Sequence, residues 1–146
     1  MSEARTYPQR PYLAVSAAII RAGKVLVVRR ARQPAQSLYT FPGGAVEVGE
    51  TLNEAAIREV REETSLAIEP VALAGHREVI SRDAQGRVER HFLILCLAAH
   101  WRSGDVKLNE ELDDARWVTP AEISGLRTTD GLADIAAAAF ARLAQD

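Results

Sequence analysis

Residues 43–66 of the chain read GGAVEVGETLNEAAIREVREETSL. Two glycines open this stretch, and a run with helical periodicity follows Gly49. Thr51 with Glu54 three residues later is the pattern of a capping box, in which each side chain satisfies a free backbone amide at the start of a helix. The spacing predicts a helix from Thr51 to about Thr64.

The predicted helix gathers carboxylates on one side. At 100° per residue, Glu59, Glu62 and Glu63 share an arc of about 100°, while Ala56, Ile57, Val60 and Thr64 lie on another side. Like charges at this spacing destabilise a helix by a few tenths of a kcal/mol per pair, and a bound cation removes that cost. Hard divalent cations prefer carboxylate and carbonyl oxygens, so the cluster suits Mg²⁺ or Mn²⁺.

A solvated helix face is the simpler interpretation, because Arg58 lies four residues from both Glu54 and Glu62, at salt-bridge spacing. The wider pattern favours a metal site. It runs Gly44, five residues, Glu50, seven residues, Arg58-Glu59-Val60, one residue, Glu62-Glu63, one residue, Ser65 and Leu66. Chance agreement with such a pattern is on the order of one in 10⁸ per starting point. The pattern resembles the Nudix box.

The resemblance extends beyond the box. Residues 41–44 (FPGG) and 115–118 (ARWV) also look like segments of the Nudix hydrolase family, so the likeness covers roughly residues 12–126. The chain departs from the family pattern at Ser65, where the motif has glycine. Glycine commonly supplies the left-handed conformation that ends a helix, so the geometry of the helix end is open at this position.

The resemblance also implies roles for individual residues. Glu50 would brace Arg58 and so orient the glutamates, which has a physical rationale in the bracing of metal ligands by surrounding groups. The general base would be Glu59 or a glutamate of a later loop, Glu110 or Glu111, although residues 109–114 also fit a solvated acidic turn. The expected metal ligands are Glu59, Glu62, Glu63 and the carbonyl of Gly43, and the expected substrate contacts are Arg30 and Gly44.

The reaction that the resemblance implies is attack of a metal-activated water on a phosphorus of a diphosphate linkage, without a protein nucleophile. The layout is similar to ADP-ribose pyrophosphatase-like and mutator-type members. A nucleoside diphosphate linked to another moiety is therefore the expected substrate, with ADP-ribose as first candidate. The alternatives are a (d)NTP pyrophosphohydrolase that cleans the nucleotide pool and a non-catalytic nucleotide-sensing module.

The remaining sequence predicts a mixed sheet flanked by helices, in an α/β (α+β) sandwich of the Nudix-like α/β/α kind. We expect residues 1–146 to form a single domain, with residues 1–11 as a loose lead-in. A loop rich in glycine and proline is expected at residues 31–49, and an antiparallel hairpin at residues 71–80 and 88–101. The other expected elements are strands at 13–20, 24–30 and 115–118 and helices at 120–126 and 132–143.

Composition narrows the expected partners. The chain has 146 residues, 47% of them hydrophobic, and a net charge of -2, which gives no general attraction for nucleic acid or anionic membranes. The apolar run at 13–20 is far shorter than the roughly 20 residues that span a bilayer. We therefore expect a cytoplasmic enzyme acting on small nucleotides, in which the single cysteine, Cys96, is a buried hydrophobe. Dimerisation is common among similar proteins, so a homodimer is an expected assembly.

Overall fold

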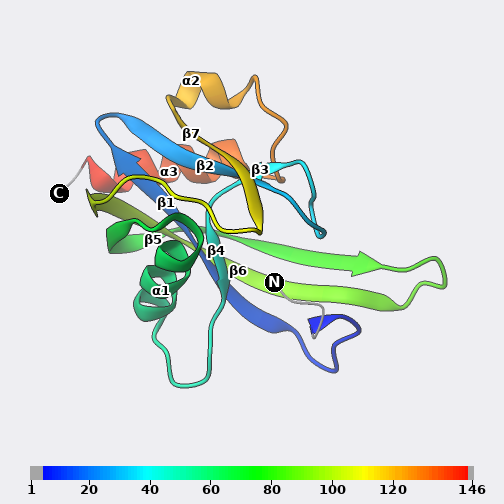
Figure 1. Cartoon of the computed structure of the whole chain (residues 1–146). Coiled ribbons are helices and arrows are strands. Elements are labelled where there is room, and N and C mark those ends of the chain that lie inside the picture. The colour runs from blue at the N-terminus through cyan, green and yellow to red at the C-terminus, as the bar shows by residue number, and fades with distance from the viewer. Residues whose placement is uncertain (1–4, 145–146) are drawn as a thin grey trace.

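The computed structural model describes residues 5–144, and the chain forms one mixed sheet with helices on both sides (Figure 1). The strands and helices follow one another in the order β1 (Tyr12–Arg21), β2 (Lys24–Arg30), β3 (Tyr39–Thr40), β4 (Gly43–Ala45), α1 (Leu52–Thr64), β5 (Ala67–Arg82), β6 (Val88–Ser103), β7 (Leu112–Val118), α2 (Pro120–Ile123) and α3 (Leu132–Leu143).

Strand β1 is the centre of the sheet. The main strand order is β3-β2-β1-β6-β5, with β4 added beside β1 and β7 beside β2. The β1 and β6 strands run parallel, and the other pairs are antiparallel. Along one edge, β1 pairs with β4 at Ala14–Ser16 and with β2 at Ile20–Arg21, so this edge serves two partners. The expected mixed sheet and the β5–β6 antiparallel hairpin are confirmed.

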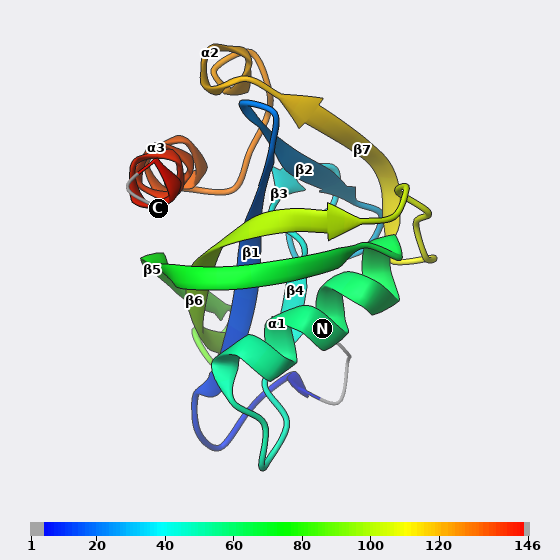
Figure 2. The same ribbon diagram turned by 90° about the vertical axis from the view of Figure 1, so that its left-hand side faces the viewer.

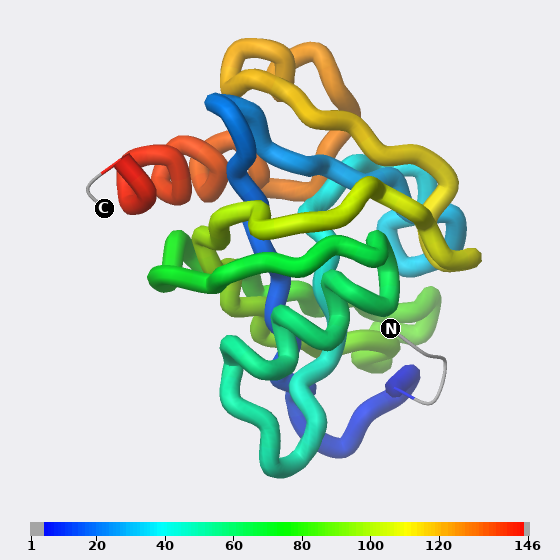
Figure 3. The backbone as a smooth tube through the Cα atoms, turned by 60° about the vertical axis from the view of Figure 1, so that its left-hand side comes forward, coloured from blue at the N-terminus to red at the C-terminus, as the bar shows by residue number. Residues whose placement is uncertain are grey.

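Helices α1 and α3 cover opposite faces of the sheet, as Figures 2 and 3 show. The alternation of side chains along β1 explains this arrangement. Ala17 and Ile19 belong to a buried cluster that includes Val60 of α1, whereas Ala18 belongs to a cluster that includes Ile135 of α3. The predicted α/β/α sandwich is therefore confirmed, and the central strands are buried on both faces.

Helix α1 begins with the predicted capping box, in which Thr51 and Glu54 each accept from the backbone amide of the other. Its buried side differs from the predicted one. Ile57 is 36% exposed, while Glu63 is only 3% exposed. The small residues Ala55 and Ala56 lie against the sheet, so the helix is rotated and Ile57 moves to the rim of the contact.

The segment 31–49 contains two short strands that the glycine and proline content led us to exclude. At Gly43 in β4, a Cβ atom would lie 2.6 Å from the Cα of Ser16, so glycine permits this close backbone pairing with β1. Strands β5 and β7 also begin earlier than predicted, at Ala67 and Leu112, and α2 ends at Ile123. Pairing with neighbouring strands extends both strands beyond their apolar cores.

The expected lead-in falls partly outside the described residues, since its first four residues are not among them. Residues 5–11 form no strand, but they contact the hairpin tip: Tyr7 donates its amide to the Glu89 carbonyl at 2.7 Å and its hydroxyl to Asp83 at 3.0 Å. Within residues 5–144, none of the helices is long and apolar enough to cross a membrane.

Candidate active site

One pocket collects acidic side chains from three parts of the chain. It lies between α1, the end of β4 and the segment that precedes β7, and we call it the carboxylate pocket. The residues that line it are Arg5, Gly44, Ala45, Glu47, Glu59, Glu62, Glu63, Asn109 and Glu111. The three glutamates of the helix and Glu111 are therefore brought together, although more than 45 residues separate Glu111 from the helix in the sequence.

Arg58 links the helix to the loop before it. Its Nε and Nη2 atoms donate to the two carboxylate oxygens of Glu50 at 2.7 and 2.8 Å, and Nη2 also donates to the Ala45 carbonyl at 3.0 Å. The remaining nitrogen, Nη1, donates to Glu59 at 2.8 Å. This paired geometry holds the pKa of Glu50 down at about 2, first through Arg58 and then through the Glu47 amide. Glu50 therefore stays ionised at neutral pH.

Glu63 is the most deeply placed of the acidic residues. Its Oε1 accepts from the Gly43 amide at 2.9 Å, and its side chain hydrogen-bonds to Glu111. Burial raises the pKa of Glu63 to about 8, with further contributions from the charges of Glu59 and Glu111, and the Gly43 amide opposes the shift. Burial and the neighbouring carboxylates thus favour the protonated form of Glu63, and a cation bound beside it would favour the ionised form.

Glu59 is held against the backbone of β4. Burial raises its pKa, and its hydrogen bond to Arg58 opposes that shift. A Cβ atom at Gly44 would lie 2.5 Å from Glu59 Oε2 and 2.7 Å from Oε1. The absence of a side chain at Gly44 therefore makes the space that the Glu59 carboxylate occupies.

The donor set suits a hard divalent cation, because the pocket offers several carboxylates and no sulfur or imidazole ligand among the residues that line it. Within residues 5–144, no three acidic, histidine or cysteine side chains already converge at ligand distance. The hydrogen bonds of the two buried glutamates explain this, since Glu59 is turned to Arg58 and Glu63 to Gly43.

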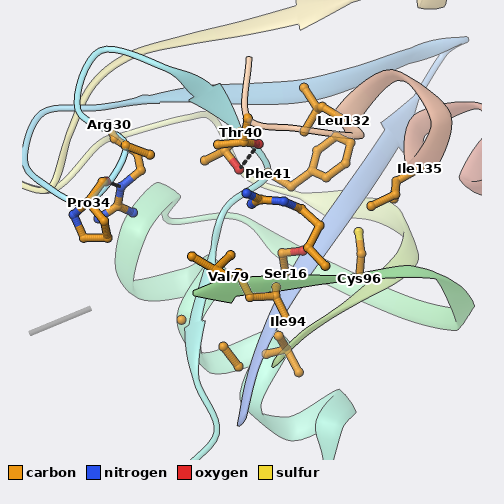
Figure 4. Close-up of a pocket in the computed structure, with 17 residues that line it drawn as sticks. Ser16, Arg30, Pro34, Thr40, Phe41, Val79, Ile94, Cys96, Leu132 and Ile135 are labelled. Carbon is orange, nitrogen blue, oxygen red and sulfur yellow. Dashed lines mark hydrogen bonds between the residues drawn. The ribbon is translucent and has the colours of Figure 1, made fainter. Parts of the chain in front are cut away.

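A second pocket lies on the α3 face of the sheet and meets the carboxylate pocket at Gly44, which lines both. We call it the arginine pocket. Figure 4 shows Ser16 and Cys96 on the sheet and Leu132 and Ile135 on the α3 side. The remaining lining residues are Ala14, Val15, Arg30, Pro34, Ala35, Thr40, Phe41, Gly43, Arg77, Val79, Ile94 and Thr129. The pocket is mostly apolar, with two guanidinium groups.

The two arginines at the end of β2 point to different places, as strand alternation predicts. Arg30 is 9% exposed, lines the arginine pocket and donates from Nε to the Pro34 carbonyl at 2.6 Å. Arg29 pairs with Asp113 at 2.6 Å on the surface. Phe41 is buried beside the pocket, and Trp101 stacks with Arg21, whose Cζ lies 3.7 Å from the ring centroid.

Several site residues carried no signal in the sequence. Arg5 reaches the carboxylate pocket and pairs with Glu47 at 3.5 Å, and Asn109 lines the same pocket. Arg77 and Thr129 line the arginine pocket. None of these residues stands in a recognisable motif, and only the folded chain brings them to the site. Glu110, by contrast, points away to Arg32 and has a side chain that is 80% exposed.

Comparison with known proteins identifies the family of the chain. The NUDIX domain model matches residues 10–140. The ADP-ribose pyrophosphatase of Methanocaldococcus jannaschii is 33% identical over 107 residues, which cover 73% of this chain and 61% of that protein. The NAD-capped RNA hydrolase NudC of Pectobacterium atrosepticum is 32% identical over 115 residues, 77% of this chain and 40% of that protein. The chain thus spans about two fifths to three fifths of these relatives.

A solved structure shows the same fold over nearly its whole length. The MutT NUDIX hydrolase from Burkholderia pseudomallei superposes with a TM-score of 0.76 at 26% identity, covering 88% of this chain and 98% of that one. The fold and site therefore define a Nudix-type hydrolase domain. The chain belongs to the NUDIX domain family.

Proposed function

We propose that this protein hydrolyses the phosphoanhydride bond of a nucleoside diphosphate linked to another moiety, with Mg²⁺ or Mn²⁺ as cofactor and ADP-ribose as the first candidate substrate. The observation that carries the proposal is the carboxylate pocket, in which Glu59, Glu62, Glu63 and Glu111 meet. The name of the relative from Methanocaldococcus jannaschii supports ADP-ribose over other diphosphates.

The residues of the site have different proposed roles. Glu59, Glu62 and Glu63 would hold a divalent cation, and the Gly43 carbonyl is a further candidate ligand. When bound, that cation supplies a Lewis acid that polarises phosphate oxygens and lowers the pKa of water. Arg58, fixed by both oxygens of Glu50, keeps Glu59 in place. Gly44 lines both pockets and Arg30 lines the arginine pocket, which supports both as substrate contacts.

Two residues are candidates for the general base that takes the proton from water. Glu59 and Glu111 both line the carboxylate pocket, whereas Glu110 does not. Glu59 is already engaged by Arg58, while Glu111 shares a hydrogen bond with Glu63. Glu111→Gln and Glu59→Gln distinguish them, because loss of the base removes the acidic limb of the pH profile of kcat and loss of a metal ligand lowers metal affinity.

Two other functions fit the same fold. A (d)NTP pyrophosphohydrolase would release a nucleoside monophosphate and pyrophosphate, and a nucleotide-sensing module would bind without turnover. The pairing of Arg58 with Glu50 beside intact glutamates disfavours the sensing module, since such a module has no need of oriented metal ligands. We further propose a cytoplasmic protein that acts on free nucleotides rather than nucleic acid, as a monomer or homodimer.

The test is a hydrolysis screen with product analysis. Purified protein with Mg²⁺ or Mn²⁺ is given ADP-ribose, NADH, a dinucleoside polyphosphate, dNTPs and NAD-capped RNA, with EDTA as the metal-free control. We expect AMP and ribose 5-phosphate from ADP-ribose, without pyrophosphate. Pyrophosphate from dNTPs with ADP-ribose left intact would instead establish the triphosphatase. Binding without turnover across the whole panel would establish the sensing module.

A further inference from the structure

Arg77 is a charged residue of the arginine pocket and has no direct partner in the part of the chain that the structure describes. It lies in the middle of β5 and is half-buried. Within residues 5–144 its guanidinium makes no hydrogen bond or ion pair, and Asp130 acts on it only through its longer-range charge. Burial lowers the pKa of Arg77 because the cation loses water. An arginine in this state has donors available for a ligand.

Sheet register determines which pocket Arg77 faces. Arg77 stands opposite Ile94 of β6, and Ile94 stands opposite Ala14 of β1. Side chains at directly opposed positions share one face of a sheet, and all three residues line the arginine pocket. The neighbouring residue Glu78 is exposed on the other face. The position of Arg77 is thus fixed by strand pairing rather than by a flexible loop.

The charges of the two pockets are opposite. The arginine pocket has Arg30 and Arg77 in its lining and, among the residues of 5–144 that line it, no aspartate or glutamate. Arg30 is partly engaged by the Pro34 carbonyl. Removing a cation from water, even in part, is costly unless an anion pairs with it, so a site with one buried and one half-buried guanidinium group and apolar walls suits an anionic ligand. Arginine binds phosphate and carboxylate groups through paired hydrogen bonds.

We propose that Arg77 is a specificity-determining residue that binds a second anionic group of the nucleotide substrate, a phosphate or carboxylate outside the scissile diphosphate. This inference rests on the proposed function for the location of the diphosphate, and it selects, within the class of nucleoside diphosphates linked to another moiety, members with a further anionic group, which ADP-ribose lacks. The diphosphate belongs in the carboxylate pocket on the α1 face, and Arg77 lies on the α3 face, with Gly44 as the common boundary. The substrate therefore extends across β4, with its diphosphate in the carboxylate pocket and its second anionic group in the arginine pocket.

The experiment compares ligand pairs that differ by one anionic group. Isothermal titration in EDTA measures AMP against adenosine 2′,5′-bisphosphate and UDP-glucose against UDP-glucuronate. The proteins are the wild type, Arg77→Gln, Arg77→Lys and the matched control Arg82→Gln. Arg82 lies on the same strand, at the hairpin end, where it donates to the Gly86 carbonyl at 3.1 Å. Melting temperatures check the fold, and none of the variants should lose more than a few degrees.

In at least one pair the wild type should bind the more anionic member roughly tenfold more tightly or better, the size of one charged hydrogen-bonded contact. Arg77→Gln should abolish this preference, Arg77→Lys should restore only part of it, and Arg82→Gln should keep it. Equal binding of both members in both pairs by the wild type would overturn the proposal. So would a preference that survives in Arg77→Gln.

Hydrolysis assays on the same proteins separate this proposal from the proposed function. If no substrate is hydrolysed but the charge preference depends on Arg77, the proposed activity fails and the anion site stands. If hydrolysis occurs and the KM values for UDP-glucose and UDP-glucuronate, the pair that carries a diphosphate, are both unaffected by Arg77→Gln, the proposed activity stands and the anion site fails. We expect an increased KM for the anionic member with kcat within about threefold of wild type.

Discussion

Gly43 and Gly44 are neighbours in β4, but a side chain on each would meet different atoms. At Gly43 a Cβ atom would meet the backbone of β1, which cannot move aside without breaking strand pairing. At Gly44 it would meet the carboxylate of Glu59, the free end of a flexible side chain. The first position therefore serves the fold and the second serves the site.

This difference predicts opposite outcomes for two alanine substitutions. Gly44→Ala should leave the melting temperature within a few degrees of wild type but lower kcat on the best substrate about a hundredfold, because Glu59 is displaced. Gly43→Ala should lower the melting temperature strongly. Gly125→Ala is the control, since its nearest neighbour would be at an ordinary 3.6 Å. Thermal unfolding measures the melting temperatures, and steady-state kinetics measures kcat. A fully active Gly44→Ala would contradict the role assigned to the space at Gly44.

At the scale of single residues, the sequence predicted the local part of the site and missed the distant part. The capping box and the positions of Glu59, Glu62 and Glu63 on one helix follow from spacing alone. The burial of Glu63 does not, because it depends on the Gly43 amide from another element. Arg77 was not identified because a lone arginine in a strand carries no motif.

At the scale of elements, the C-terminal end of α1 keeps a left-handed cap although its residue, Ser65, departs from the glycine of the Nudix box. Ser65 takes the left-handed conformation, with φ of 67°, that glycine favours, and its amide donates to the Arg61 carbonyl at 2.9 Å. The helix end is therefore the same kind of cap as the motif requires. For a residue other than glycine, this conformation costs roughly 1 kcal/mol.

Ser65→Gly should accordingly stabilise the protein by about 1 kcal/mol and raise its melting temperature by roughly 3 °C. The weak hydrogen bond from Ser65 Oγ to the Lys107 carbonyl, at 3.4 Å, offsets little of this gain. Ser124→Gly is the matched control, because Ser124 ends α2 in the right-handed conformation and should gain nothing. Calorimetry measures both changes. A lower melting temperature for Ser65→Gly would show that the serine contributes more than the strain costs.

Strands β3, β2 and β7 are also joined by side chains. Tyr39 and Asp114 stand on either side of Arg29 in the sheet register, and the Tyr39 hydroxyl donates to the Asp114 carboxylate. This hydrogen bond is the main cause that lowers the pKa of Asp114, while burial and the same bond raise the pKa of Tyr39. A carboxyl group whose pKa is lowered in the folded protein stabilises the fold at pH values above its pKa in the unfolded chain, about 3.9. That contribution to stability disappears as the pH falls through the pKa of the folded state.

Tyr39→Phe should therefore cost about 1–2 kcal/mol of unfolding free energy at pH 7, and less as Asp114 becomes protonated. In the same variant, the Asp114 carboxyl should titrate closer to its ordinary pKa. Denaturant unfolding at several pH values and carbon NMR of the carboxyl measure the two effects. Tyr12→Phe is the control, since within residues 5–144 the Tyr12 hydroxyl makes no hydrogen bond. An unchanged Asp114 pKa would contradict the assigned cause.

At the scale of the whole molecule, the mixed sheet and its two covering helices were predictable because hydrophobic periodicity marks long elements well. The short strands β3 and β4 were not, since their pairing depends on the close approach that Gly43 allows. The meeting of Glu111 with the helix glutamates depends on how β7 returns beside β2. Sequence spacing cannot contain that information, because it arises only when distant elements pack.

Mn²⁺ binding followed by electron paramagnetic resonance tests most directly whether the carboxylate pocket holds a divalent cation. Wild type is compared with Glu63→Gln, which keeps an acceptor for the Gly43 amide, and with Glu78→Gln, an exposed acid on β5. Wild type and Glu78→Gln should bind Mn²⁺, and Glu63→Gln should bind it at least tenfold more weakly. Equal binding by all three proteins, or none by wild type, would contradict a cation site in this pocket.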